Sequence, residues 1–129
     1  MARILIADDH EIVRKGIRTM LQARPGWEIC GEAKNGREAV QLAQELNPDV
    51  IILDVSMPVL GGLGAADDIL RVNPNIKILI FTMDESKTLR TLVQRCGARG
   101  LVVKSQASDV LVQALDQLLA GSTFFSSIN

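Results

Sequence analysis

Apolar residues along the chain follow two spacings that alternate from one end to the other. Short runs rich in branched aliphatic residues suit β-strands, and most of their apolar residues are consecutive, as in strands covered on both faces. These runs occupy residues 3–7 (RILIA), 28–33 (EICGEA), 50–53 (VIIL), 77–81 (KILIF) and 100–103 (GLVV). The run EICGEA alternates apolar and polar residues instead, which favours a strand at the edge of the sheet.

Between these runs, apolar residues recur at intervals of three and four, the spacing of one helical face. The predicted faces are Ile12, Val13, Gly16, Ile17, Met20 and Leu21; Ala39, Val40, Leu42, Ala43 and Leu46; Leu63, Ala66, Ile69 and Leu70; Leu89, Leu92, Val93 and Cys96; and Val110, Leu111, Ala114, Leu115, Leu118 and Leu119. Asn35 followed by Glu38 has the spacing of a capping box, and Ser108 suits the N-cap of the last helix.

Five strands alternating with five helices predict an α/β fold, with a parallel sheet covered by helices on both faces. The 129 residues suffice for one domain, and only the tail from residue 122 onward departs from the alternating pattern. In open parallel sheets, functional groups gather beyond the carboxyl ends of the strands. The residues that follow each strand are therefore the first place to look for chemistry.

Composition narrows the class of protein. Hydrophobic residues make up 47% and charged residues 22%, which allows a sizeable core, and the net charge of −1 gives no sign of a nucleic-acid binder. Cys30 and Cys96 lie far apart, which favours free thiols in a reducing compartment over the alternative of a structural disulfide. Acids follow closely on the N-terminus, which argues against a signal peptide. No apolar run approaches the ~20 residues of a membrane helix. We therefore expect a soluble cytoplasmic protein without membrane contact.

Polar side chains follow four of the five predicted strands. Asp8 and Asp9 follow the first strand, Asp54 the third, Thr82 the fourth and Lys104 the fifth, whereas the second strand supplies nothing comparable. Because the carboxyl ends of parallel strands lie at one edge of the sheet, these groups are expected to meet there.

Three neighbouring carboxylates repel one another, so a compensating positive charge is needed. Lys104 supplies one charge and a divalent cation would supply more. Mg²⁺ suits oxygen ligands, and the sequence has no His and Cys set with zinc-like spacing. Acids around such an ion are typical of phosphoryl-transfer sites, where a carboxylate can itself become phosphorylated. Asp54 is central, Asp8 and Asp9 are suited to the metal, and Thr82 and Lys104 can hold phosphoryl oxygens.

These residues in this order resemble the receiver domain of two-component response regulators. The matching pieces are ILIADDH, VIILDVSMP with its Met57-Pro58, IFT and GARGLVVK, and they cover essentially the whole chain. The segments ADDH and AGSTFF are most similar to the NarL/FixJ type. The resemblance implies a flavodoxin-like (βα)5 three-layer sandwich with strand order 2-1-3-4-5. It also implies a receiver domain over residues 1–121, with residues 122–129 beginning a linker to an effector domain outside this chain.

The resemblance also implies a role for each residue of the set. Asp54 is the expected phosphoacceptor. Asp8 and Asp9, most directly Asp9, are expected to bind Mg²⁺ together with Asp54 and the backbone carbonyl of Ser56. Thr82 and Lys104 are expected to bind the phosphoryl group.

The implied function is that of a signalling domain whose only catalysis is its own phosphorylation and dephosphorylation. A sensor histidine kinase donates the phosphoryl group, and the surface from the fourth helix to the fifth strand then changes. In this type of receiver the output is transcription, through a helix-turn-helix domain that makes the only contact with DNA. Pairing of two copies into a homodimer is a further expectation.

Several positions depart from the usual receiver pattern and are candidate modulators. Leu101 stands where Tyr or Phe is common, so it cannot make the aromatic swing that couples many receivers to their outer surface. Met83 replaces the usual small residue beside Thr82 and is placed to crowd or shield the phosphoryl group. Ser56, two residues after Asp54, and Asp84, two residues after Thr82, are further candidate modulators.

Three other functions are compatible with parts of this pattern. A pseudo-receiver would use the same fold as a constitutive interaction module without phosphorylation. An aspartate-dependent phosphatase usually carries Asp-x-Asp, whereas the acids here are adjacent. A flavodoxin would need a phosphate-binding loop after the first strand, where Asp8 and Asp9 would repel phosphate.

Overall fold

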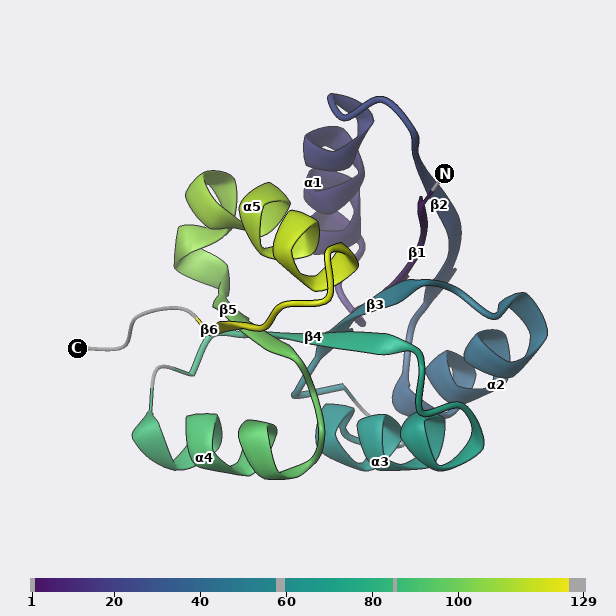
Figure 1. The fold of residues 1–129 in the computed structure, drawn as a ribbon, viewed down its shortest axis with the longest axis vertical. Helices are drawn as coiled ribbons and strands as arrows, with labels where there is room; N and C mark the ends of the chain where they lie inside the picture. Colours follow the sequence, from purple (N-terminus) through teal and green to yellow (C-terminus); the bar gives the residue numbers. More distant parts are fainter. Residues whose placement is uncertain (1, 58–59, 85, 126–129) are drawn as a thin grey trace.

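The computed structural model describes residues 2–57, 60–84 and 86–125, which form a parallel sheet with helices on both of its faces (Figure 1). Pro58 and part of the predicted linker lie outside the described residues. In chain order the elements are β1 (Ala2–Ala7), α1 (Glu11–Gln22), β2 (Trp27–Ala33), α2 (Gly36–Leu46), β3 (Val50–Asp54), α3 (Gly62–Val72), β4 (Lys77–Thr82), α4 (Lys87–Arg95), β5 (Gly100–Val103), the 3-10 turn η1 (Lys104–Gln106), α5 (Ala107–Leu119) and β6 (Phe124–Phe125).

The strands are arranged in the order β2-β1-β3-β4-β5-β6, so the first five have the predicted flavodoxin-like order. The alternating strand β2 lies at the sheet edge, as predicted. The sixth strand was not predicted: Phe124 and Phe125 pair in parallel with Gly100 and Leu101 of β5. The two rings pack on opposite faces of the sheet, and this pairing covers what would otherwise be an open strand edge.

The sheet separates two apolar cores. Helices α1 and α5 cover one face, and α2, α3 and α4 cover the other (Figure 1). Strand β3 lies between β1 and β4, and all five of its residues are buried. This burial on both faces explains why its sequence shows consecutive rather than alternating apolar residues.

Helix boundaries and faces test the sequence pattern more finely. The capping box is confirmed, since Glu38 N–H donates to Asn35 Oδ1 at 2.8 Å. The predicted N-cap Ser108 is wrong: α5 begins at Ala107, because the turn η1 runs directly into it and Gln106 is the capping position. Ile12 is 84% exposed although it was assigned to a core face, because α1 is rotated so that Arg14 faces inward. Leu92 of α4 is likewise exposed rather than core.

The expectation of free cysteines is confirmed. Cys30 and Cys96 are free, half-buried thiols, and burial raises the pKa of each. Within the described ranges, every helix is too short or too polar to cross a bilayer.

Candidate functional site

The carboxyl ends of four neighbouring strands bring the predicted polar residues to one edge of the sheet. Asp8 follows β1, Asp54 and Thr82 are the last residues of β3 and β4, and Lys104 follows β5. Asp8, Asp54 and Thr82 are each only 1% exposed. Burial of two carboxylates at one site is costly unless other groups compensate their charge.

Lys104 provides that compensation within the protein. Its Nζ donates to Asp8 Oδ2 at 2.9 Å and lies 3.4 Å from Asp54 Oδ1. The side chain is only 14% exposed and its ammonium group also lies 5.6 Å from the centre of the Phe81 ring. One cation therefore serves two buried carboxylates.

Asp54 is held by its own loop and by the start of α3. The backbone N–H of Ser56 lies 3.3 Å from Asp54 Oδ1, and the Ser56 hydroxyl lies 3.3 and 3.5 Å from the two carboxylate oxygens. Helix α3 begins against the backbone of Asp54, where a Cβ on Gly62 would lie only 2.2 Å from the Asp54 carbonyl oxygen. Glycine at position 62 therefore permits the close approach that supports this loop.

The surroundings of Asp54 make ionisation of its carboxyl group harder than it is in water. Burial raises the pKa of Asp54, and the negative charge of Asp8 raises it further. The Ser56 N–H and Lys104 oppose this rise without cancelling it. A further positive charge at the site would therefore stabilise the ionised form of Asp54.

The side chains that could hold such a cation lie close together. Asp8, Asp9, His10 and Asp54 offer ligand atoms that all lie within 4.8 Å of one another. His10 Nδ1 lies 3.0 Å from Asp9 Oδ1 and 3.3 Å from Asp8 Oδ1, while the His10 N–H donates to Asp8 at 2.8 Å. We call Asp8, Asp9 and Asp54 the acid cluster. Its oxygen-rich composition fits a hard divalent cation such as Mg²⁺.

Thr82 is connected to α4 by a series of hydrogen bonds. Its Oγ1 accepts from the N–H of Asp84 at 2.9 Å, and Asp84 Oδ1 accepts from the N–H of Ser86 at 2.7 Å. Ser86 in turn caps α4 by accepting from Leu89 N–H at 3.1 Å. A movement of the Thr82 hydroxyl would therefore alter the support of the α4 N-terminus.

The other candidate modulators occupy different surroundings. Met83 is 81% exposed and borders a groove of about 510 Å³ together with Val13, Lys104 and Ser105. Leu101 is fully buried, paired with Ile80 on one side and Phe125 on the other. Met83 is thus at the mouth of the site, whereas Leu101 is part of the core.

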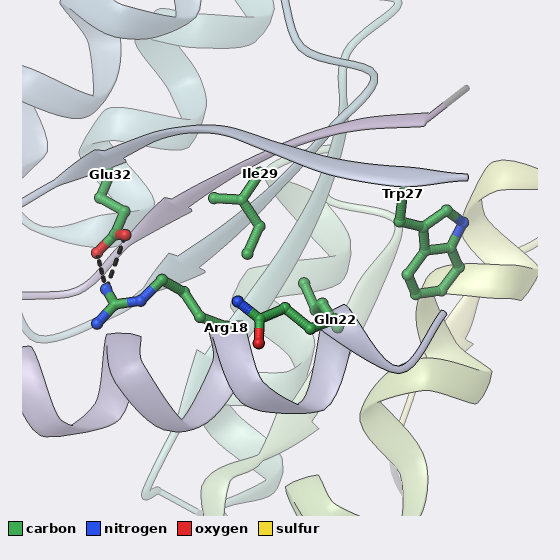
Figure 2. Close-up of a pocket in the computed structure, with 6 residues that line it drawn as sticks. Arg18, Gln22, Trp27, Ile29 and Glu32 are labelled. Carbon is green, nitrogen blue, oxygen red and sulfur yellow. Dashed lines mark hydrogen bonds and ion pairs between the residues drawn. The ribbon is translucent and has the colours of Figure 1, made fainter. Parts of the chain in front are cut away.

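The pattern of strand ends missed a second charged group beside the acid cluster. Arg14 and Arg18 of α1 both donate to Glu32 of β2, and we call these three residues the arginine network. Figure 2 shows the Arg18–Glu32 pair at one end of a pocket of about 310 Å³ that also includes Trp27. The second strand therefore does supply a charged side chain near its end. A signal was present in the sequence, because Arg14 stands three and seven residues before the apolar Ile17 and Leu21, the spacing of one helical face.

Comparisons with known proteins identify one protein family. Residues 4–116 match the response regulator receiver domain family. The response regulator GacA of Pseudomonas aeruginosa is 39% identical over 126 residues, which cover 98% of this chain and 59% of GacA. UvrY of Escherichia coli is 35% identical over 127 residues, covering 98% of this chain and 58% of UvrY. The chain thus spans somewhat more than half the length of these curated relatives.

Solved structures give the same result for the fold. A LuxR-family two-component response regulator from Aurantimonas sp. SI85-9A1 superposes with a TM-score of 0.92 at 38% identity, covering 96% of this chain and 89% of that one. The isolated REC domain of RcsB from Salmonella enterica serovar Typhimurium, with the phosphomimetic BeF3-, gives 0.91 at 29% identity, covering 98% and 94%. Sequence, fold and the clustered acids lead to one conclusion: this chain belongs to the response regulator receiver domain family.

Proposed function

We propose that this domain is a phosphorylation-dependent switch in which Asp54 accepts a phosphoryl group from a histidine kinase. The observation that carries the proposal is the meeting of Asp8, Asp9, Asp54, Thr82 and Lys104 at one sheet edge. Asp54 is the central carboxylate, and burial together with the charge of Asp8 raises its pKa. Such a site gains the most from a bound cation and from a phosphoryl group held by that cation.

Mg²⁺ would be held by Asp8, Asp9 and Asp54, with the backbone carbonyl of Ser56 as a further ligand. When bound, the ion neutralises the acids and draws phosphoryl oxygens toward the site. An Asp54 oxygen forms a bond to phosphorus while the bond between phosphorus and the histidine nitrogen of the donor breaks. The leaving imidazole then retains its electron pair and takes up a proton. In the later hydrolysis a water oxygen forms a bond to phosphorus while the bond between phosphorus and the Asp54 oxygen breaks. Asp54 keeps the electron pair as a carboxylate, and the water proton and inorganic phosphate leave to solvent.

Lys104 and Thr82 would bind the new phosphoryl oxygens. Lys104 Nζ already lies 3.4 Å from Asp54 Oδ1, so a small shift would bring it to a phosphoryl oxygen. The Thr82 hydroxyl accepts from Asp84 N–H in the described state, and turning toward the phosphoryl group would end that hydrogen bond. Hydrogen bonds to charged groups contribute about 1.5–3 kcal/mol, enough to shift a two-state equilibrium by tenfold or more.

The conformational change that follows phosphorylation would pass from Thr82 to α4. Loss of the Thr82–Asp84 hydrogen bond would weaken the series that ends at the Ser86 cap of α4. Leu101 is fixed in the core and carries no aromatic ring, so this loop supplies the coupling in place of an aromatic swing. The surface of α4 and β5 is then the part of the domain whose shape depends on phosphorylation.

The output of the full-length protein would be transcription. Relatives of this chain include the transcriptional regulatory protein DegU of Brevibacillus brevis, at 31% identity over 122 residues. These residues cover 52% of DegU, so an effector domain outside this chain would make the contact with DNA. In that arrangement a sensor histidine kinase is the phosphoryl donor, and pairing of two receivers would join two effector domains.

The test is incubation with acetyl phosphate and Mg²⁺, followed by intact mass measurement. We expect a mass gain of one phosphoryl group that is lost in mild base and is absent with a metal chelator. The adduct should disappear in Asp54→Asn. Asp67→Asn, on the exposed face of α3, is the matched control and should be phosphorylated like the wild type. Absence of the adduct in the wild type would instead support a pseudo-receiver that acts as a constitutive interaction module.

A further inference from the structure

We infer that Arg14 is a positioning residue for the metal site, because it holds the peptide group between Asp8 and Asp9. This inference rests on the proposed Mg²⁺ site and concerns how the chain shapes it. Arg14 Nη1 donates to the backbone carbonyl oxygen of Asp8 at 2.7 Å. Because a peptide group is planar, that carbonyl and the N–H of Asp9 turn together. The contact therefore sets the direction in which the chain passes from one carboxylate to the next.

The other side of Asp8 is fixed by the sheet. Asp8 N–H donates to the carbonyl of Ala33, at the end of β2, at 3.1 Å. Its carboxylate is held by His10 N–H and by Lys104. With Arg14 on the carbonyl, the amide, carbonyl and carboxylate of Asp8 each have a partner. Within the described part of the chain, the Asp9 carboxylate lies 3.0 Å from His10 Nδ1. The peptide that precedes Asp9 also sets where this carboxylate lies.

Arg14 can hold this peptide because it is itself held. It is 7% exposed, and its Nε donates to Glu32 Oε1 at 3.0 Å. Arg18 secures the same carboxylate through contacts of 2.6 and 2.7 Å (Figure 2). The planar guanidinium group of Arg14 thus spans the Asp8 carbonyl and the Glu32 carboxylate with donors at fixed angles. A lysine ammonium has no such fork.

The direction of the expected effect separates positioning from simple electrostatics. Arg14 is a cation in contact with the backbone of Asp8, so removing its charge alone would strengthen Mg²⁺ binding by reducing repulsion. Positioning has the opposite sign: without Arg14, the Asp8–Asp9 peptide gains freedom and Mg²⁺ binding weakens. Mg²⁺ demands near-ideal octahedral geometry, so its affinity is sensitive to small shifts of the ligands.

The test is calorimetric titration of the protein with Mg²⁺ alone. Arg14→Met should weaken binding about tenfold, the lower end of what loss of a group supporting metal ligands costs. Arg18→Met is the matched control, because it also removes one cation from Glu32 but leaves the Asp8 carbonyl untouched. Because Arg18 reaches the Asp8 carbonyl only indirectly, through Glu32 and Arg14, its variant should lose less affinity than Arg14→Met and stay within about twofold of the wild type.

Phosphorylation by acetyl phosphate provides a second measurement. Arg14→Met should need a higher Mg²⁺ concentration for half-maximal rate, while its rate at saturating Mg²⁺ stays near that of the wild type. Arg14→Lys tests the inference should the methionine variant not fold. Its single ammonium group should restore only part of the affinity, leaving a loss of at least about threefold.

Three outcomes would overturn the inference about Arg14. They are tighter Mg²⁺ binding in Arg14→Met, equal losses in the Arg14 and Arg18 variants, and full affinity in Arg14→Lys. Failure of the proposed function gives a different result, because the wild type itself would then bind no Mg²⁺ and acquire no phosphoryl group.

Discussion

The acid cluster and the arginine network lie on either side of the end of β1, and they balance their charges differently. The acid cluster sets three carboxylates against one lysine, and the pKa of Asp54 is raised, first by burial and then by the charge of Asp8. The arginine network sets two arginines against one carboxylate, and Glu32 contacts both of them at 3.0 Å or less. The first group is short of positive charge, while the second satisfies its hydrogen bonds within the protein.

This difference separates two uses of buried charge. A satisfied network fixes geometry at all times and needs no ligand. A site short of positive charge is less stable alone but gains free energy when a cation arrives. Arg14 joins the two groups, since it belongs to the network and holds the backbone of the cluster.

The largest change is expected for Glu32→Ala. It leaves Arg14 buried without its carboxylate partner, which should lower the free energy of unfolding by about 3 kcal/mol, the low end for breaking a buried ion pair. Urea unfolding followed by circular dichroism measures the effect. Glu28→Ala, an exposed position on the same strand, is the control and should change stability little. Because the network needs no metal, the Glu32 loss should remain large in Mg²⁺. A loss no greater than that of the control would contradict the proposed role of the network.

The second change concerns Lys104→Met. Without the ammonium group, Asp8 and Asp54 lose their shared partner, and stability in a metal chelator should fall by about 2 kcal/mol. Added Mg²⁺ should narrow the gap to the wild type, because the ion supplies the missing positive charge. Lys15→Met, an exposed position on α1, serves as the control for the loss of a surface lysine. A gap that is the same with and without Mg²⁺ would place the effect outside the acid cluster.

Asp54→Asn should act in the opposite direction and stabilise the metal-free protein at neutral pH. Burial and the charge of Asp8 raise the pKa of Asp54 above 3.8, so the folded state holds its proton more tightly than the unfolded state does. Wild-type stability from this group is present at low pH and is lost as the pH rises through the folded pKa. Unfolding measured between pH 4 and pH 8 in chelator should show the variant's advantage growing with pH. An advantage that stays constant across this range would rule out titration of Asp54 as its cause.

Asp9→Ala should change the metal-free stability least, by less than about 0.5 kcal/mol, which is usual for a surface position. Its side chain is 28% exposed and its loss reduces repulsion within the cluster. The same variant should lose the increase in melting temperature that Mg²⁺ gives the wild type. A thermal scan with and without Mg²⁺ tests both statements. An unfolded variant would mean that Asp9 is a structural residue.

The positions of the strands and the members of the site could be predicted from local pattern. The predicted strand at residues 50–53 matches the observed Val50–Asp54 to within one residue. The match is close because a strand buried on both faces has consecutive apolar residues, which are easy to recognise. Asp8, Asp54, Thr82 and Lys104 were found by their order along the chain. Parallel strands bring their carboxyl ends together whatever the details of packing, so proximity of these four residues follows from topology alone.

The rotation of helices and the sixth strand could not be predicted in this way. The apolar spacing of α1 included Ile12, yet packing against β2 turned Arg14 inward and left Ile12 exposed. Phe124 and Phe125 are too few to show the apolar pattern of a strand. Phe124 and Phe125 became a strand only because the edge of β5 was available to pair with them.

The ion pair between Arg14 and Glu32 could not be predicted from the local sequence pattern. The pairing of β1 with β2 shifts register between Ile4 and Leu5, so that Ile4 pairs with Ile29 and Leu5 with Gly31. One extra residue moves the following side chains to the opposite face of a strand. This shift lets Glu32 face α1, on the same side as Trp27 and Ile29. Residue order alone therefore identified the chemical groups of the site and the sheet edge where they meet. Three-dimensional packing decided which side chains hold them in place, because register and helix rotation depend on contacts between distant parts of the chain.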